Sequence, residues 1–195
     1  DVVHLYQTHV YDPETPSLEV VATMNDLIKE GKIFHYGFSN YGPKNIIDAV
    51  RACDENGLIR PVSLQPSYSL GGWGSEEAIK TAREYDMSIL AFSPLHKGFF
   101  TDKQIMQHHR EDRLQEAIRE KFRQLQAFAE DHGRNIQQLA IAWLMHQEGV
   151  IPILGTYRSE HLEDLVKAAD WKLDDEAISL IGKVRAEAFA ILSNH

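Results

Sequence analysis

Short apolar runs alternate with longer amphipathic stretches along this chain. The runs show no clean polar alternation, which is typical of strands covered on both faces of a parallel sheet. The longer stretches repeat apolar residues at the spacing of one helix face. The pattern predicts strands at Val2–Tyr6, Phe34–Phe38, Val62–Leu64, Ile89–Phe92 and Val150–Ile153.

Helix signals lie between the predicted strands. Thr15-Pro16 is a good helix start, with a capping hydroxyl ahead of a proline in the first helical position. Gly31 suits the left-handed residue that ends this helix, and Asn135 with Gln138 has the spacing of a capping box. Helices are expected after each strand, with two more, one before the fifth strand and one at the end. The alternation predicts an α/β fold with parallel strands in a single domain, residues 1–195.

Polar residues follow each predicted strand. They are His9; Ser39 and Asn40; Gln65; Ser93; and Gly155 with Thr156. The carboxyl ends of parallel strands share one rim, so we expect these residues to converge there. Amides, a hydroxyl and an imidazole suit a flat amide-bearing ligand and a reacting carbonyl. The alternative for each residue alone is a polar group that caps a helix.

His9 is the best candidate for chemistry. A neutral imidazole can donate to a carbonyl oxygen that gains negative charge, whereas the alternative is a histidine simply hydrogen-bonded at a strand end. The glycine-rich stretch Gly71–Gly74 matches no phosphate-binding pattern, and we expect a mobile loop with an exposed Trp73. That tryptophan could instead form one wall of a substrate pocket.

Charge and cysteine content exclude several classes of protein. The chain has 195 residues and a net charge of −9, and no Lys/Arg cluster exceeds a pair, so nucleic-acid binding is not expected. No run approaches the ~18 apolar residues of a membrane helix. The single cysteine, Cys53, lies on an apolar helix stripe, and we expect it to be buried and the protein to be cytoplasmic. The ten histidines show no metal-ligand spacing, so no metal is expected.

Four segments together resemble the aldo-keto reductases. Asp1–His9 is similar to the family's fourth strand with its active-site histidine, and Gly31–Asn40 is similar to its fifth-strand signature. Val62–Ser69 and Leu90–Leu95 are similar to the sixth and seventh strands. The resemblance implies a (β/α)8 TIM barrel, of which this chain holds the last five strand–helix units and two extra helices.

The resemblance also implies a nicotinamide cofactor, NADP(H) or less often NAD(H). Ser39, Asn40 and Gln65 would hold its carboxamide, and Phe92 would stack against its ring, where the family often has tyrosine. The residues that would lie along the pyrophosphate are Ser93, Leu95 and the loop near Lys97-Gly98. Those that would surround the adenosine 2′-phosphate are Thr156, Tyr157 and Arg158. Lys97, Lys103 and Arg158 are otherwise solvated surface charges, and Leu165 stands where many members carry an asparagine near the adenine.

The implied activity is NADP(H)-dependent reduction of aldehydes or ketones to alcohols. His9 would orient the carbonyl, but the family's catalytic tyrosine, lysine and aspartate come from the first part of the barrel and have no counterpart in this sequence. This chain alone is therefore expected not to turn over. Alternatives are a non-catalytic regulatory subunit similar to the potassium-channel β subunits, and an unrelated phosphate-binding barrel. The open sheet edges would be covered by further strands or, through self-association, by another copy.

Overall fold

The computed structural model describes residues 1–96, 112–156 and 158–193. The candidates outside these residues are Lys97, Gly98, Lys103 and Tyr157. The chain divides into two compact units, which we describe separately. The first unit comprises Asp1–Ser67, Gly74–Phe92 and Gly149–Ile151, and the second comprises Tyr68–Trp73, Ser93–Glu148 and Pro152–His195. The single domain over 1–195 stays a prediction.

The predicted strands form one sheet in the order in which they occur along the chain. They are β1 (Val3–Thr8), β2 (Ile33–Ser39), β3 (Ser63–Gln65), β4 (Ser88–Ala91) and β5 (Val150–Pro152). The pairs β1–β2, β2–β3 and β3–β4 are parallel, which confirms the predicted α/β class and strand direction. β1 extends two residues beyond its predicted end because Gln7 and Thr8 still pair with β2. This fold matches part of a (β/α) barrel.

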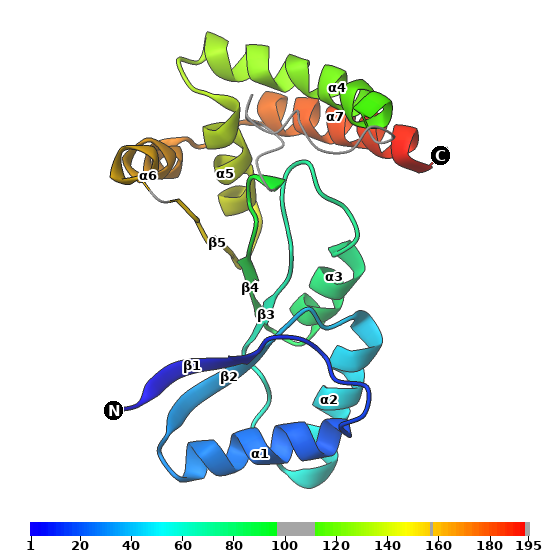
Figure 1. Ribbon diagram of the computed structural model, residues 1–195, viewed down its shortest axis with the longest axis vertical. Helices are drawn as coiled ribbons and strands as arrows, with labels where there is room; N and C mark the ends of the chain where they lie inside the picture. The colour runs from blue at the N-terminus through cyan, green and yellow to red at the C-terminus, as the bar shows by residue number, and fades with distance from the viewer. Residues whose placement is uncertain (97–111, 157, 194–195) are drawn as a thin grey trace. The chain divides into compact units, whose positions relative to one another are not determined.

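Helices alternate with the strands as predicted (Figure 1). The first unit holds α1 (Ser17–Lys29), α2 (Pro43–Asn56) and α3 (Glu76–Glu84). The second unit holds α4 (Asp112–Asp131), α5 (Ile136–His146), α6 (Ser159–Val166), the short 3-10 helix η3 (Lys167–Asp170) and α7 (Asp175–Ser193). The two additional helices are confirmed, one of them before β5 and α7 at the end. No helix in the described ranges has the length and apolar character needed to span a membrane.

The helix ends follow the sequence signals with one exception. Gly31 has a φ of 71°, as expected after a helix, and the capping box of Asn135 and Gln138 is present. The expected Thr15 cap is wrong, because the helix begins one residue later, where the Val20 N–H donates to the Pro16 carbonyl at 3.2 Å. Pro16 occupies the N-cap position instead, without a side-chain hydrogen bond.

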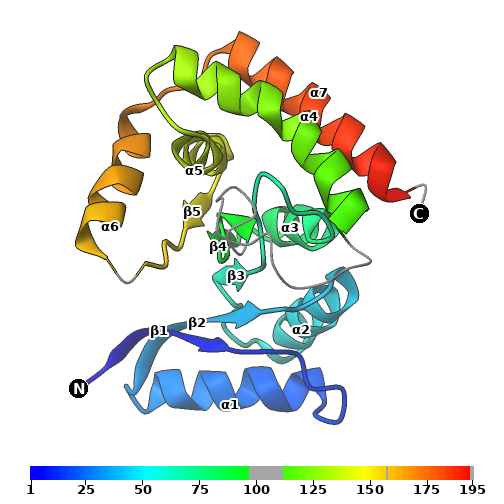
Figure 2. The ribbon, with the colours of Figure 1, turned by 45° about the horizontal axis from the view of Figure 1, so that its top comes forward.

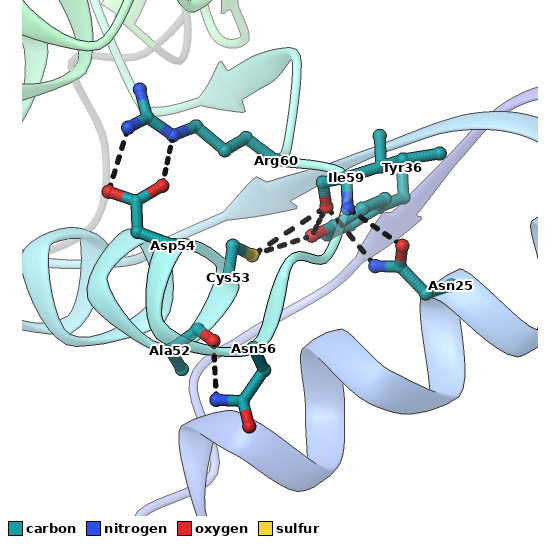
Figure 3. Close-up of polar contacts among 8 residues, drawn as sticks. All are labelled: Asn25, Tyr36, Ala52, Cys53, Asp54, Asn56, Ile59 and Arg60. Atoms are coloured by element: carbon teal, nitrogen blue, oxygen red, sulfur yellow. Dashed lines mark hydrogen bonds and ion pairs between the residues drawn. The ribbon is translucent and has the colours of Figure 1, made fainter.

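The core of the first unit lies between β2 and the helices α1 and α2, which pack against each other (Figure 2). Tyr36 of β2 is fully buried, and its hydroxyl donates to the Ile59 carbonyl at 2.7 Å (Figure 3). The Cys53 thiol lies 3.4 Å from the Tyr36 hydroxyl and contacts the same carbonyl at 3.6 Å. Cys53 is therefore buried, as predicted.

Burial of these two groups predicts a loss of stability at alkaline pH. Burial raises the pKa of the Tyr36 phenol and of the Cys53 thiol. In the unfolded chain both ionise near their ordinary values, so the unfolded state is favoured as the pH rises above about 8.5 to 10. We expect Tyr36→Phe to reduce the slope of the free energy of unfolding between about pH 9 and 11, measured by urea unfolding. If Tyr36→Phe had the same slope as the wild type, the buried Tyr36 phenol would not contribute to the alkaline loss of stability.

The second unit is helical. α4 and α7 lie side by side in both views (Figures 1 and 2). Leu125 of α4 and Val184 of α7 are buried. α5 is buried over most of its length, Leu139 and Leu144 included. Its capping residue Asn135 also donates to the Asp164 carboxylate of α6 at 2.8 Å, which joins the start of α5 to α6.

Candidate functional site

The ends of the first three strands lie side by side in the first unit. Ser39 is the parallel partner of Gln65, and Thr8 is the partner of Phe38, so His9 follows β1 at the same edge. Asn40 comes directly after β2. The parallel pairing thus brings together four of the sequence-predicted residues: His9, Ser39, Asn40 and Gln65. We call this group the β1–β3 rim.

Hydrogen bonds connect the β1–β3 rim across its three strands. The Asn40 side-chain amide donates to the His9 carbonyl at 2.9 Å and to the Ser39 hydroxyl at 3.1 Å. The Ser39 hydroxyl donates in turn to the Gln65 carbonyl at 2.8 Å, and the Asn40 backbone N–H donates to the same oxygen at 3.3 Å. The backbone of the candidate catalytic residue His9 is therefore tied directly to the candidate cofactor residue Asn40.

Several polar groups of the rim remain available to a ligand. Asn40 uses both amide hydrogens, which leaves its Oδ1 as an acceptor. Within the described part of the chain, the Gln65 side-chain amide and the His9 imidazole have no hydrogen-bond partner. His9 is also exposed. The rim can thus offer donors and acceptors to a flat amide, together with one imidazole.

Asn40 is held in an uncommon backbone conformation. Its φ is 58°, in the left-handed region that asparagine tolerates better than most residues. Tyr41 follows and is buried, with its ring stacked on Phe38 at 4.2 Å between centroids. Burial raises the pKa of the Tyr41 phenol. This aromatic pair anchors the chain immediately after Asn40.

Phe92, the residue expected to stack on the nicotinamide, directly follows β4 in the same unit. It is half-buried and forms a parallel bridge with Ser67, and its N–H donates to the Pro66 carbonyl at 3.1 Å. The predicted fourth strand therefore ends one residue early in β4, but its pairing direction continues to Phe92.

The second unit contains the candidates for the phosphate end. Ser93 has a φ of 54° and begins a tight turn in which the His96 N–H donates to the Ser93 carbonyl at 2.8 Å. Leu95 lies inside this turn and is half-buried. We call residues 93–96 the β4 turn.

Thr156 and Arg158 precede helix α6. The Arg158 N–H donates to the Thr156 hydroxyl at 3.2 Å, and Arg158 is exposed as the N-cap residue of α6. Further along α6, both carboxylate oxygens of Asp164 accept hydrogen bonds from the start of α5, and Leu165 is buried. Leu165 is thus an apolar core residue of this unit.

Two polar contacts of the structure were missed by the sequence analysis. The Gln7 side chain donates to the Ser63 hydroxyl at 3.2 Å, and Gly37 lies against Ser63. In the second unit, Arg185 contacts Trp73, which is half-buried and also packs against Phe189. The expectation of an exposed tryptophan at this position is therefore wrong. No local sequence pattern marks Gln7 or Arg185.

Metal ligands do not gather in the described ranges. No three His, Cys, Asp or Glu side chains come close enough there to hold an ion.

Comparison with known proteins agrees with this geometry. Parallel strands that alternate with helices define an α/β protein, here with polar residues at the carboxyl ends of its strands. The family model described as "Aldo/keto reductase family" matches residues 1–186. The chain belongs to the aldo/keto reductase family, as its sequence indicated.

Curated relatives support this assignment. The chain is 30% identical over 206 aligned residues to aldo-keto reductase str7 of Strobilurus tenacellus, which covers 96% of this chain and 59% of the relative. It is 28% identical over 192 residues to probable aldo-keto reductase 1 of Glycine max, covering 90% and 53%. It is also 28% identical over 187 residues to L-glyceraldehyde 3-phosphate reductase of Escherichia coli (strain K12), covering 86% and 54%. The chain spans between half and three-fifths of the length of these relatives.

Proposed function

We propose that this chain binds NADP(H) and forms the cofactor-binding part of an oxidoreductase that reduces a small carbonyl substrate to an alcohol. The observation that carries the proposal is the hydrogen-bonded β1–β3 rim, where Asn40 uses both amide hydrogens on His9 and Ser39. A carboxamide needs one acceptor for its NH2 group and one donor for its oxygen. Asn40 Oδ1 and the Gln65 side-chain amide fit these two needs.

His9 has the proposed role of orienting the substrate. Bound nicotinamide would supply the hydride, and the exposed imidazole can donate a hydrogen bond to a carbonyl oxygen that gains negative charge. Asn40 holds the His9 carbonyl at 2.9 Å, so the imidazole starts from a backbone fixed to the carboxamide-binding residue. The Escherichia coli relative is named for the reduction of an aldehyde, which supports an aldehyde as the substrate class.

The preference for NADP(H) over NAD(H) rests on Arg158. Its guanidinium is exposed, and its backbone is held by the Thr156 hydroxyl at the start of α6. A guanidinium binds a phosphate dianion with two parallel hydrogen bonds, whereas the ribose hydroxyl of NAD(H) offers no charge to it. The expected order of affinity is therefore NADPH above NADH.

The proposal is tested by titrating the chain with NADPH and following the nicotinamide fluorescence. Asn40→Asp keeps the size of the side chain and its tolerance of positive φ, but it replaces the donor to His9 and Ser39 by an oxygen. We expect NADPH affinity to fall by about tenfold or more, since 1.4 kcal/mol corresponds to a factor of ten. Asn56→Asp makes the same chemical change at an exposed helix end and is expected to bind as the wild type does.

Two results would contradict the proposal: absence of NADPH binding by the wild-type chain, or equal affinity of Asn40→Asp and the wild type. The variants are compared only after circular dichroism shows that their helix content is unchanged.

The second candidate function is cofactor binding without turnover, as in a regulatory subunit. It would use the same hydrogen-bonded rim, in which Asn40 holds His9 and Ser39, and would leave the His9 imidazole without a role. Steady-state NADPH oxidation with a panel of aldehydes separates the two functions. A reductase consumes NADPH in this assay, and a subunit binds it without consumption.

A further inference from the structure

The side chain of Arg185 in α7 holds the loop that follows β3. Its Nη1 donates to the Ser69 carbonyl at 3.0 Å and also to the Leu70 carbonyl, and its Nη2 donates to the Gly72 carbonyl at 3.4 Å. The Gly72 N–H donates to the Ser69 carbonyl at 3.2 Å, so the loop is closed on itself. One guanidinium thus fixes three carbonyls of a tight turn.

Two tryptophan rings fix the orientation of this guanidinium. Its central carbon lies 4.6 Å from the ring centroid of Trp143 in α5 and 5.4 Å from that of Trp73. A planar guanidinium can stack on aromatic faces and donate several hydrogen bonds at its edge at the same time, which a lysine ammonium cannot do. The Arg185 guanidinium is therefore held in one orientation, in which it supports the loop after β3.

The same loop contacts the β4 turn through Ser69. Ser69 is buried, and its hydroxyl lies 3.4 Å from Nδ1 of His96, within hydrogen-bond distance. A Cβ atom at Gly72 would lie 2.7 Å from the Ser69 hydroxyl and 3.2 Å from His96 Nδ1, so the packing here is tight. A displacement of the loop would therefore change the contacts of the His96 side chain.

The β4 turn needs support of this kind. Ser93 and His96 have φ values of 54° and 47°, and residues other than glycine reach this region at a cost. Such conformations persist when surrounding contacts hold them. Ser69 is one such contact, and Arg185 fixes Ser69.

We infer that Arg185 is a positioning residue for the cofactor, acting through Ser69 and His96 on the β4 turn that would lie along the pyrophosphate. The inference rests on the proposed NADP(H) function, because the β4 turn lies along a pyrophosphate only if the chain binds this cofactor. Arg185 itself would touch no part of the cofactor.

The first test needs no ligand and uses the whole 195-residue chain. Arg185→Met retains a long side chain against Trp73 and Trp143 but removes the guanidinium. Ser69→Ala removes only the hydroxyl that contacts His96. Both are expected to shift the imidazole NMR signals of His96. Lys183→Met removes a cation from an exposed position on the same helix and is expected to leave these signals in place. Unchanged His96 signals in Arg185→Met would overturn the coupling.

The second test compares two ligands for the same variants. NADPH contains the pyrophosphate, whereas adenosine 2′-monophosphate lacks it. We expect Arg185→Met and Ser69→Ala to weaken NADPH binding by about tenfold and binding of adenosine 2′-monophosphate by less than about twofold. Arg185→Lys is expected to restore little, because an ammonium cannot bind the three carbonyls together. Lys183→Met should bind both ligands as the wild type does.

If Arg185 only stabilised the fold, Arg185→Met would weaken the binding of NADPH and of adenosine 2′-monophosphate equally. This result would overturn the inference. Unchanged NADPH binding in Arg185→Met and Ser69→Ala would overturn it as well. A wild-type chain that binds no dinucleotide would instead refute the proposed function together with the cofactor part of this inference. The NMR measurement then decides by itself whether Arg185 holds the β4 turn.

Discussion

Replacing Gly37 by alanine is expected to lower the free energy of unfolding by about 3 kcal/mol, near the upper end of the cost of overpacking a core. Gly37 lies in the middle of β2, and an added Cβ atom would meet the Ser63 hydroxyl and lie 2.7 Å from the Ser63 carbonyl oxygen. The hydroxyl can rotate, but the carbonyl belongs to β3, so the two strands must separate. Urea unfolding followed by circular dichroism measures the change.

A second glycine provides the matched control for this experiment. Gly182 lies inside α7, and nothing is within 4 Å of a Cβ atom added there. Alanine is the better helix former, so Gly182→Ala is expected to raise the free energy of unfolding by about 0.5 to 1 kcal/mol. Adding Ser63→Ala to Gly37→Ala should recover only part of the loss, because the backbone contact remains. A Gly37→Ala variant within about 1 kcal/mol of the wild type would contradict the argument.

Replacing Asn25 by alanine is the second change with a large expected effect. Asn25 is buried in α1, where its amide donates to the Val21 carbonyl at 2.8 Å. The same amide donates to the Ile59 carbonyl at 3.1 Å (Figure 3). Its Oδ1 accepts from the Ile59 N–H at 2.8 Å. The substitution leaves that N–H without its acceptor, and we expect a loss of about 3 kcal/mol in the free energy of unfolding.

Asn56→Ala is the control for Asn25→Ala. Asn56 is exposed at the end of α2 and donates only to the Ala52 carbonyl, four residues earlier in the same helix (Figure 3). Its replacement is expected to change the free energy of unfolding by less than about 0.5 kcal/mol. Equal effects of the two substitutions would show that the bridge from Asn25 to Ile59 does not contribute to stability.

The proposed site and the stability of the first unit are connected through β2. This strand presents Tyr36 to the helices, approaches Ser63 at Gly37, and ends in Ser39 at the rim. A variant that separates β2 from β3 would therefore also displace the pairing of Ser39 with Gln65. We expect Gly37→Ala to bind NADPH more weakly for this reason.

The sequence by itself determined the order of the elements and the four residues of the β1–β3 rim. An apolar run followed by Ser39 and Asn40 has few alternatives to a buried strand with a polar end. Gly31 and the pair Asn135–Gln138 are local signals, since the backbone groups they satisfy lie within a few residues of them. Even so, Thr15 shows that a local signal can misplace a helix start by one residue, since Pro16 is the N-cap residue of α1.

The tertiary structure decided the contacts between residues far apart in the chain. Arg185 reaches carbonyls that are 113 to 116 residues earlier, and Gln7 bonds to a serine 56 residues later. Neither residue carries a local pattern, because its partner is chosen by the packing of helices and strands and not by spacing along the sequence. The sequence therefore determined which residues stand at the strand ends, and only the fold decided which side chains hold them in place.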